Sequence, residues 1–152
     1  MTKGDSLLNG IIDGIVDGSK EIYNPVYFYG DEGLVADTLY RIANDYKRLH
    51  SSARFAWFSG DKYVHELLMA IKEGRSDKLR QLHRACDFLL FDHVEHIAGK
   101  QYTMKEFFEL FDHIFIRGGR IVVTGNNAPG MIEGLEDRIR TQLEGGIVYQ
   151  IK

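Results

Sequence analysis

The stretch Tyr23 to Leu39, YNPVYFYGDEGLVADTL, decides the fold that the rest of the sequence must fit. Val26 to Tyr29 are β-branched and aromatic residues, which favour a buried strand. Gly30 and Gly33 follow and permit a tight backbone turn. Apolar residues then recur at helical spacing, at Val35, Leu39, Ile42, Tyr46 and Leu49. A strand, a glycine loop and a helix are the setting of a phosphate-binding loop, in which backbone N–H groups at a helix N-terminus hold an anion.

This predicted loop has the setting of a phosphate site but not its chemistry. A working loop brings a lysine and a hydroxyl residue into the start of the helix, where they bind phosphate and magnesium. Here the matching triplet is Val35-Ala36-Asp37, and Thr38 lies one position late. Asp31 and Glu32 add negative charge, which is favourable at a helix N-terminus but unfavourable for a polyphosphate. Two interpretations stay open: a nucleotide site that has lost its chemistry, or an ordinary strand-turn-helix.

Composition places the chain of 152 residues among single-domain globular proteins. Its net charge of −3 and isoelectric point near 6.1 provide no global positive field for nucleic acid or membranes, so a basic surface must be local. The single Cys86 excludes an internal disulfide and fits a reducing compartment. The sequence shows no signal peptide and no membrane-spanning apolar run. We therefore expect a cytoplasmic protein without membrane association.

Predicted strands and helices alternate along the chain. Residues 1–22 are predicted as an amphipathic helix that docks on the core domain, because its three glycines weaken it in isolation. After the first strand, further strands are predicted at Phe55–Phe58, Phe88–Phe91, Ile121–Thr124 and Ile147–Ile151. Helices are predicted after Ser59, over 76–85, over Thr103–Phe115 and over Met131–Leu143. This alternation predicts a three-layer α/β/α domain over residues 23–152, with a five-stranded parallel sheet.

Two of these helices have predicted core faces that can be listed from their spacing. The helix after Ser59 is expected to bury Tyr63, Val64, Leu67, Leu68 and Ile71. The helix over Thr103–Phe115 is expected to bury Met104, Phe107, Phe108, Phe111 and Phe115. Because these phenylalanines share one helical face, we interpret them as core rather than as a platform for stacking bases.

Asp92 follows the predicted strand Phe88–Phe91, where a phosphate-loop enzyme places its magnesium-side aspartate. The next residue is His93, where a water-activating acid would help. The run Asp92-His93-Val94-Glu95-His96 also resembles a metal cluster. Its spacing brings together at most a pair of ligands, whereas transition-metal sites usually need three or four. We therefore predict no metal site here, and the simpler interpretation is a polar strand end.

One local basic surface is predicted in the segment 72–84. It contains Lys72, Arg75, Lys78, Arg80 and Arg84. Only Glu73 and Asp77 oppose them within the segment. Such a run is usually a solvated helix face, but it also fits contact with a phosphate backbone. Both interpretations stay open.

In their order and spacing, the features from Tyr23 onward resemble the nucleotide-binding AAA+ domain of the bacterial replication initiator DnaA and its DnaA-like relatives. Phe88–Asp92 resembles the Walker B strand, Val122–Asn126 the sensor 1 strand, and Leu135–Arg138 the motif called box VII. The resemblance implies a P-loop NTPase core. Because the sequence ends at the last predicted strand, we expect it to lack the family's helical lid and its helix-turn-helix domain.

Departures from the family fall at the positions that handle ATP. Ala36 stands at the Walker A lysine position and Asp37 at the hydroxyl position. His93 replaces the second Walker B acid, and Asn126 replaces an acidic sensor 1 residue. Loss of one positioned charge typically costs orders of magnitude in phosphoryl transfer. We therefore predict no ATPase activity and no ATP, ADP or magnesium cofactor. The resemblance implies a vestigial nucleotide site made of Gly30, Gly33, Ala36, Asp37, Asp92 and Asn126.

The resemblance also implies surfaces for subunit and DNA contact. Arg138 is retained from box VII, while Gln142 stands where the arginine finger would align, which makes both candidates for a subunit interface. Residues 61–86 resemble the paired helices that line a channel for single-stranded DNA in the family. Tyr102 stands at an arginine position and could stack on a base. The candidate DNA-binding residues are Lys72, Arg75, Lys78, Arg80, Arg84, Lys100, Tyr102 and Thr103.

Three functions are carried forward. The first is a catalytically inactive regulator or adaptor that contacts a replication initiator or another replication protein, with self-association into a homo-oligomer as a further expectation. The second is a single-stranded DNA-binding module that uses the basic helices at 72–84. The third is an ATP-binding ATPase with an unusual loop, which ATP protection against thermal unfolding would reveal.

Overall fold

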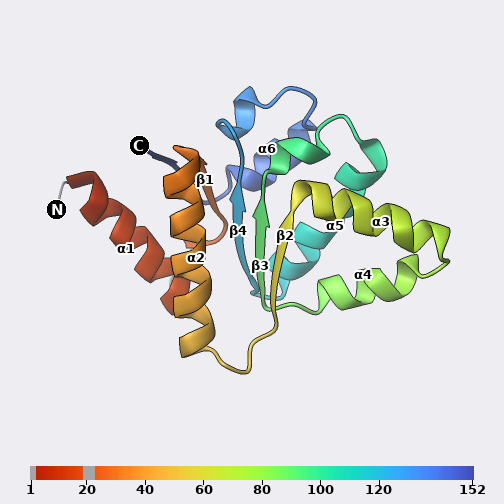
Figure 1. The fold of residues 1–152 in the computed structure, drawn as a ribbon, viewed down its shortest axis with the longest axis horizontal. Coiled ribbons are helices and arrows are strands. Elements are labelled where there is room, and N and C mark those ends of the chain that lie inside the picture. The colour runs from red at the N-terminus through yellow and green to blue at the C-terminus, as the bar shows by residue number, and fades with distance from the viewer. Residues whose placement is uncertain (1–2, 19–22) are drawn as a thin grey trace.

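The computed structural model describes residues 3–18 and 23–152, and the ends of the first predicted segment, residues 1–2 and 19–22, lie outside this description. Helices and strands alternate through most of the chain (Figure 1). In chain order they are α1 Lys3–Asp17, β1 Val26–Gly30, α2 Glu32–Leu49, β2 Phe55–Ser59, α3 Gly60–Lys72, α4 Ser76–Arg84, β3 Phe88–Asp92, η2 Val94–Ile97, α5 Gln101–Ile116, β4 Arg120–Thr124, η3 Pro129–Met131, α6 Asp137–Leu143 and β5 Ile147–Ile151.

The five strands form one parallel sheet in the order β2-β3-β4-β1-β5. Parallel strands covered on both faces are continuous apolar runs, as β3 is. Helices lie on both sides of the sheet, so the predicted three-layer α/β/α class is confirmed (Figure 1). Because all strands run the same way, their carboxyl ends meet at one edge, and this edge carries the site described below.

Alternate residues of strands β1 to β4 enter two different cores. Val26 and Phe28 pack with α1 and α2, whereas Tyr27 packs with α3 to α6 on the opposite face. Both cores consist mainly of aliphatic and aromatic side chains, with Phe88 and Phe107 completely buried. Burial of such side chains contributes roughly 1.5–3 kcal/mol each, which makes these two cores the main source of stability.

Helix α1 packs on the sheet beside α2. Ile11, Ile12 and Ile15 are buried in the same core as α2. Gly14 has a packing role, because a Cβ at this position would lie 2.5 Å from the Tyr23 ring. The helix is therefore maintained by tertiary contacts rather than by its intrinsic propensity.

The predicted helix over Met131–Leu143 is wrong in its first half. A short 3₁₀ turn at Pro129–Met131 is followed by an irregular segment, and α6 begins only at Asp137. Gly134 has a φ of 82°, and its carbonyl accepts a hydrogen bond from Gly99 N. Ile132 and Leu135 are nevertheless buried. Their apolar spacing therefore anchors a loop to the core and does not mark a helical face.

Three residues predicted to be buried are instead exposed. Leu68 and Ile71 of α3 lie outside the core, as does Phe115 at the end of α5. The buried face of α3 includes Tyr63, Leu67 and Ala70, and Leu68 and Ile71 lie next to it. The predicted core face of this helix was therefore too wide. Within residues 3–18 and 23–152, no helix has the length and hydropathy needed to cross a membrane.

Candidate functional site

A cleft of about 520 Å³ opens at the carboxyl edge of the sheet, beside the N-terminal half of α2. The ends of β1, β3 and β4 form its floor, and α2 and β2 form its walls. Its lining residues are Gly30, Glu32, Val35, Ala36, Leu39, Tyr40, Trp57, Asp92, His93, Glu95, Thr124, Gly125 and Asn126. Clefts at this edge of an α/β sheet are the usual place for ligands.

The predicted glycine loop is a helical turn. Helix α2 begins at Glu32, only two residues after β1 ends at Gly30. Asp31 is the N-cap, and its carboxylate accepts a hydrogen bond from Leu34 N at 2.9 Å. The N–H of Val35 donates to the Asp31 carbonyl at 2.8 Å. Two amides that a phosphate loop would offer to an anion are thus used within the helix.

Gly30 is required for strand packing. Its φ is 123°, and a Cβ at this position would lie 2.0 Å from the carbonyl oxygen of Ile151 on β5. Gly33 lies in the first turn of α2, where a Cβ would meet only Asp31 Oδ1 at an ordinary 3.5 Å. The expectation that both glycines shape a tight loop is therefore wrong for Gly33.

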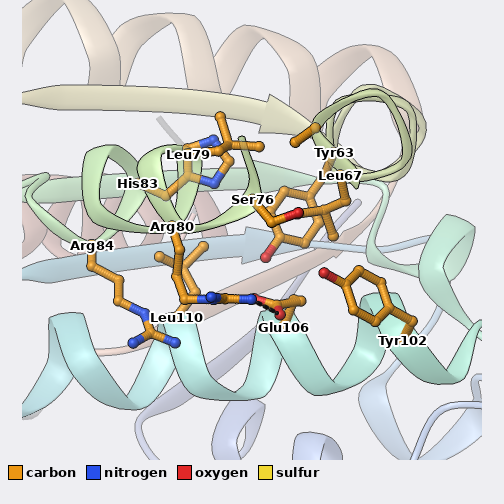
Figure 2. A pocket seen from close by; sticks show the side chains of 11 residues that line it. Tyr63, Leu67, Ser76, Leu79, Arg80, His83, Arg84, Tyr102, Glu106 and Leu110 are labelled. Atoms are coloured by element: carbon orange, nitrogen blue, oxygen red, sulfur yellow. Dashed lines mark hydrogen bonds and ion pairs between the residues drawn. The ribbon is translucent and has the colours of Figure 1, made fainter. Parts of the chain in front are cut away.

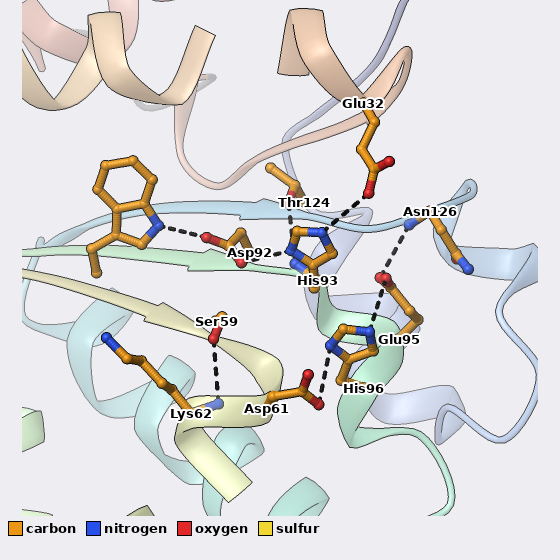
Figure 3. Close-up of polar contacts among 11 residues, drawn as sticks. Glu32, Ser59, Asp61, Lys62, Asp92, His93, Glu95, His96, Thr124 and Asn126 are labelled. Atoms are coloured by element: carbon orange, nitrogen blue, oxygen red, sulfur yellow. Dashed lines mark hydrogen bonds and ion pairs between the residues drawn. The ribbon is translucent and has the colours of Figure 1, made fainter. Parts of the chain in front are cut away.

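The carboxylate of Asp92 is bonded at both oxygens (Figure 3). The indole N–H of Trp57 donates to Oδ2 at 2.6 Å, and Nδ1 of His93 lies 2.7 Å from Oδ1. Trp57 comes from β2 and Asp92 from the end of β3, so the pairing of these strands fixes the contact. The short distances are typical of hydrogen bonds to an ionised acceptor.

His93 connects this carboxylate to α2. Its Nε2 lies 3.6 Å from Glu32 Oε1, and its backbone N–H donates to Thr124 Oγ1 at 3.3 Å (Figure 3). The hydrogen bond to Asp92 raises the pKa of His93 above the ordinary 6.5, against the opposing effect of desolvation. The protonated imidazole is therefore favoured next to Asp92.

Glu95 and His96 extend the polar network along η2. One Glu95 oxygen accepts a hydrogen bond from the backbone N–H of Asn126 at 3.1 Å. His96 lies between Glu95 and Asp61, 3.7 Å and 3.2 Å from their carboxylates. In the part of the chain that the structure describes, no group of three or more His, Cys, Asp or Glu side chains could hold a metal ion.

The structure brings together only some residues of the predicted nucleotide site. Gly30, Ala36, Asp92 and Asn126 line the cleft. Gly33 does not line it, and Asp37 lines a different hollow between α1, α2 and β5. The described residues of the cleft do not fit a magnesium-bound triphosphate, because none of them is lysine or arginine and the aspartate is already bonded twice.

Sequence reasoning missed Trp57 and Tyr40. Their rings contact at 5.0 Å between centroids and form the aromatic wall of the cleft. Trp57 lies within the predicted strand Phe55–Phe58, and Tyr40 lies on the exposed side of α2. The only available signal was a large aromatic residue outside the apolar stripe of its helix.

The basic segment at 72–84 is largely neutralised by ion pairs. Arg80 forms two hydrogen bonds to Glu106 of α5, at 2.7 Å and 3.2 Å (Figure 2). Arg84 pairs with Glu109 at 3.3 Å, and Arg75 pairs with Glu73 at 3.1 Å. The Arg80 guanidinium holds the pKa of Glu106 below its usual value. The three arginines of the predicted DNA surface are thus engaged within the protein, and Arg80 fastens α4 to α5.

The other predicted DNA-contacting residues differ in accessibility. Lys72 and Lys78 are exposed, and no ion pair or hydrogen bond joins their side chains to another described residue. Thr103 is buried, with 3% of its surface exposed, so its side chain is not accessible to a DNA strand bound at the surface. Lys100 donates from Nζ to the His96 carbonyl, and Tyr102 is 41% exposed with its ring beside Glu106 (Figure 2).

The two candidate interface residues lie on α6. Arg138 pairs with Glu136 at 2.9 Å and covers the Phe108 ring at 4.2 Å. Gln142 donates from Nε2 to the Phe108 carbonyl and to Asp112 Oδ1, at 2.9 Å and 3.0 Å. Gln142 therefore fastens α6 to α5, while Arg138 keeps a half-exposed guanidinium.

Comparison with known proteins gives one consistent answer. Residues 5–150 match the family described as the bacterial DnaA ATPase domain. The chromosomal replication initiator protein DnaA of Cereibacter sphaeroides is 30% identical over 98% of this chain, and that of Geobacter sulfurreducens is 34% identical over 86%. These matches span 33% and 29% of the two relatives, so the chain corresponds to about a third of their length.

Solved structures agree with the sequence relatives. The structure described as replication initiator DnaA bound to AMPPCP and single-stranded DNA superposes with a TM-score of 0.89 and 26% identity. The superposition covers the whole of this chain and 47% of the chain in that structure.

Proposed function

The chain belongs to the bacterial DnaA ATPase domain family, and from this premise we propose that it acts in replication initiation as a regulator or adaptor that does not use ATP. It works through contacts with a replication initiator or another replication protein. It carries no catalytic residues and needs neither nucleotide nor magnesium.

The start of α2 is the observation that carries this proposal. In a phosphate loop, free N–H groups and a lysine surround the phosphates. Here the segment after Gly30 turns at once into helix, and Asp31 fills the helix N-terminus with its own carboxylate. Ala36 supplies no charge. An incoming triphosphate would meet carboxylates in place of donors, which disfavours its binding by like-charge repulsion.

The engagement of Asp92 supports the same conclusion. Magnesium at a phosphate-loop site is held by a carboxylate with a free oxygen. The two oxygens of Asp92 accept from Trp57 and His93. Releasing them would leave a partly buried indole N–H without its partner, at a cost of about 1–3 kcal/mol.

Partner binding with and without nucleotide tests the proposal. A purified DnaA initiator is immobilised, and the chain is passed over it in buffer alone, with Mg-ATP and with Mg-ADP. The immobilised initiator carries one and the same preloaded nucleotide in all three arms, so that the arms differ only in the nucleotide offered to this chain. We expect saturable binding with the same Kd in all three arms. Absence of binding, or binding that requires nucleotide on this chain, contradicts the proposal.

Single-stranded DNA binding is the second candidate function. Lys72 and Lys78 favour it, because they are the exposed basic side chains of the 72–84 segment that no described residue engages. One structural relative was solved bound to single-stranded DNA, which is a property of that protein. Two lysines are a small electrostatic footprint, so this activity would be weak and strongly salt-dependent.

A further inference from the structure

The cleft at the carboxyl edge of the sheet carries a negative charge. Glu32, Asp92 and Glu95 contribute carboxylates to its lining, and none of the lining residues is lysine or arginine. His93 is the one lining side chain that can become positive, and it lies against Asp92. Even with His93 protonated, the four titratable groups sum to a negative charge. The cleft therefore favours a cation over the anion that a phosphate site binds.

The wall opposite the carboxylates is aromatic. Tyr40 and Trp57 meet edge to face, with ring centroids 5.0 Å apart and planes at 61°. Tyr40 is 61% exposed, although it is a large apolar ring beside a cleft. Organic cations are attracted to the faces of tryptophan and tyrosine, and the gain increases where water is excluded.

We propose that this cleft binds an organic cation, a guanidinium or an alkyl ammonium group, between the aromatic wall and the carboxylates. The inference rests on the proposed function, since it takes the cleft to be free of nucleotide. The volume of about 520 Å³ lies within the range of small-molecule sites. It exceeds what one guanidinium needs, so the aliphatic chain that carries the charge also fits, against Val35 and Leu39.

Glu32 is the carboxylate positioned to contact the cation directly. Its side chain is 92% exposed, and it has only a 3.6 Å contact with His93. Asp92 and Glu95 are each 15% exposed and already accept hydrogen bonds, so they act through their field. The arrangement gives one adaptable carboxylate at the entrance and two fixed ones deeper in the cleft.

Trp57 provides the readout, because it is the only tryptophan in the sequence. Its fluorescence is recorded during titration of the full chain with agmatine, which carries a guanidinium like an arginine side chain, and with spermidine, a free polyamine. N-butylacetamide serves as a neutral chain of similar length. Calorimetry with the same probes detects binding that leaves the fluorescence unchanged. We expect saturable binding of a cation and none of the neutral probe.

Matched variants locate the response. Glu32→Gln removes a carboxylate from the cleft, and Glu133→Gln makes the same charge change at an exposed residue outside it. We expect Glu32→Gln to weaken cation binding roughly three- to fivefold, as for one partly exposed charge contact, and Glu133→Gln to leave it unchanged. Tighter binding of agmatine indicates an arginine-like group as the natural ligand, and tighter binding of spermidine indicates a polyamine.

Three results would overturn the inference: no binding of either cation, equal binding of the neutral probe, or an identical Kd in Glu32→Gln. A parallel titration with Mg-ATP separates this failure from that of the proposed function. Saturable ATP binding contradicts the proposed function. Absence of binding by ATP and by both cations contradicts only the cation site.

Discussion

The indole N–H of Trp57 donates a 2.6 Å hydrogen bond to Oδ2 of Asp92, across the paired strands β2 and β3. The other Asp92 oxygen is taken by His93. The carboxylate at the end of β3 is therefore a structural acceptor that joins two strands at the edge of the cleft. In phosphate-loop enzymes, an aspartate at the end of a strand holds magnesium.

Replacing Trp57 by phenylalanine should lower the free energy of unfolding by about 1–2 kcal/mol, since a hydrogen bond to a charged acceptor is lost in a partly buried place. Chemical denaturation measured by circular dichroism gives the value. Tyr40→Phe is the control, because it keeps the neighbouring ring and we expect a change within about 0.5 kcal/mol. A Trp57→Phe protein as stable as the wild type would show that the contact with Asp92 contributes nothing.

Alanine at Gly33 should stabilise the protein by about 0.5–1 kcal/mol. Gly33 has room for a Cβ and lies in the first turn of α2, where glycine costs backbone entropy relative to alanine. Thermal unfolding of Gly33→Ala measures the gain. The contrasting variant is Gly30→Ala, which we expect to destabilise strongly because of the Ile151 carbonyl. Loss of stability in Gly33→Ala would mean that this segment is a strained loop and not a helical turn.

The sequence pattern was sufficient to predict the sheet and most of the helices. The three central strands β1, β3 and β4 each contain a buried apolar run, and Ser59 caps α3, so local signals and burial agree there. The pattern failed at 131–136, where Ile132 and Leu135 are spaced like a helix but anchor a loop. Apolar spacing indicates which residues are buried, and a loop that contacts the core at two positions can show the same spacing as a helix.

The candidate site was harder to predict for two physical reasons. Gly30 ends β1 and Gly33 lies in the first turn of α2, a spacing that suggests a loop, yet the Asp31 cap stabilises helix from Glu32 onward. The partners of Asp92 come from Trp57 and the adjacent His93, and only strand pairing reveals the first. Likewise, Arg80 and Arg84 look free in the sequence, because their partners Glu106 and Glu109 lie far along the chain.

Stability should decrease with rising pH through the titration of His93. The folded-state pKa of His93 is raised above its ordinary 6.5 by Asp92, so its contribution is complete below about pH 6.5 and is lost as pH rises through the folded pKa. Chemical denaturation of the wild type at pH values from roughly 5.5 to 9 covers the ordinary pKa of histidine and the raised pKa of His93. The free energy of unfolding should decrease across this range.

His93→Gln should flatten that slope while keeping a polar side chain at the strand end. His83 titrates in the opposite sense, because burial lowers its pKa. His83 is present in the wild type and in His93→Gln, so the difference between their pH slopes reports on His93 alone. Equal slopes in the wild type and in His93→Gln would show that the Asp92 contact does not stabilise the protonated imidazole.

If the chain binds single-stranded DNA, Lys72 and Lys78 should account for most of the salt dependence. Replacing each lysine by alanine should reduce the slope of log K against log salt concentration by about 0.7 per phosphate contact. Fluorescence anisotropy of a labelled oligothymidine at several salt concentrations measures the slope. Lys152→Ala, at an exposed lysine on the far side of the sheet, should leave it unchanged.

Arg80 is unsuitable for this DNA test. Its removal would leave the buried Glu106 without its partner and destabilise the contact between α4 and α5. A slope that is unaffected by both lysine substitutions, or affected equally by Lys152→Ala, would place any DNA contact elsewhere on the protein.

The most direct test of the central claim is thermal unfolding of the full chain with increasing Mg-ATP and Mg-ADP. A ligand that binds only the folded state raises the unfolding midpoint in proportion to ln(1 + [L]/Kd). We expect the same midpoint at every nucleotide concentration, because a capped helix and a doubly bonded Asp92 occupy the place of the phosphate clamp. An unfolding midpoint that rises with Mg-ATP or Mg-ADP concentration as ln(1 + [L]/Kd) would contradict the claim that the chain does not use nucleotide.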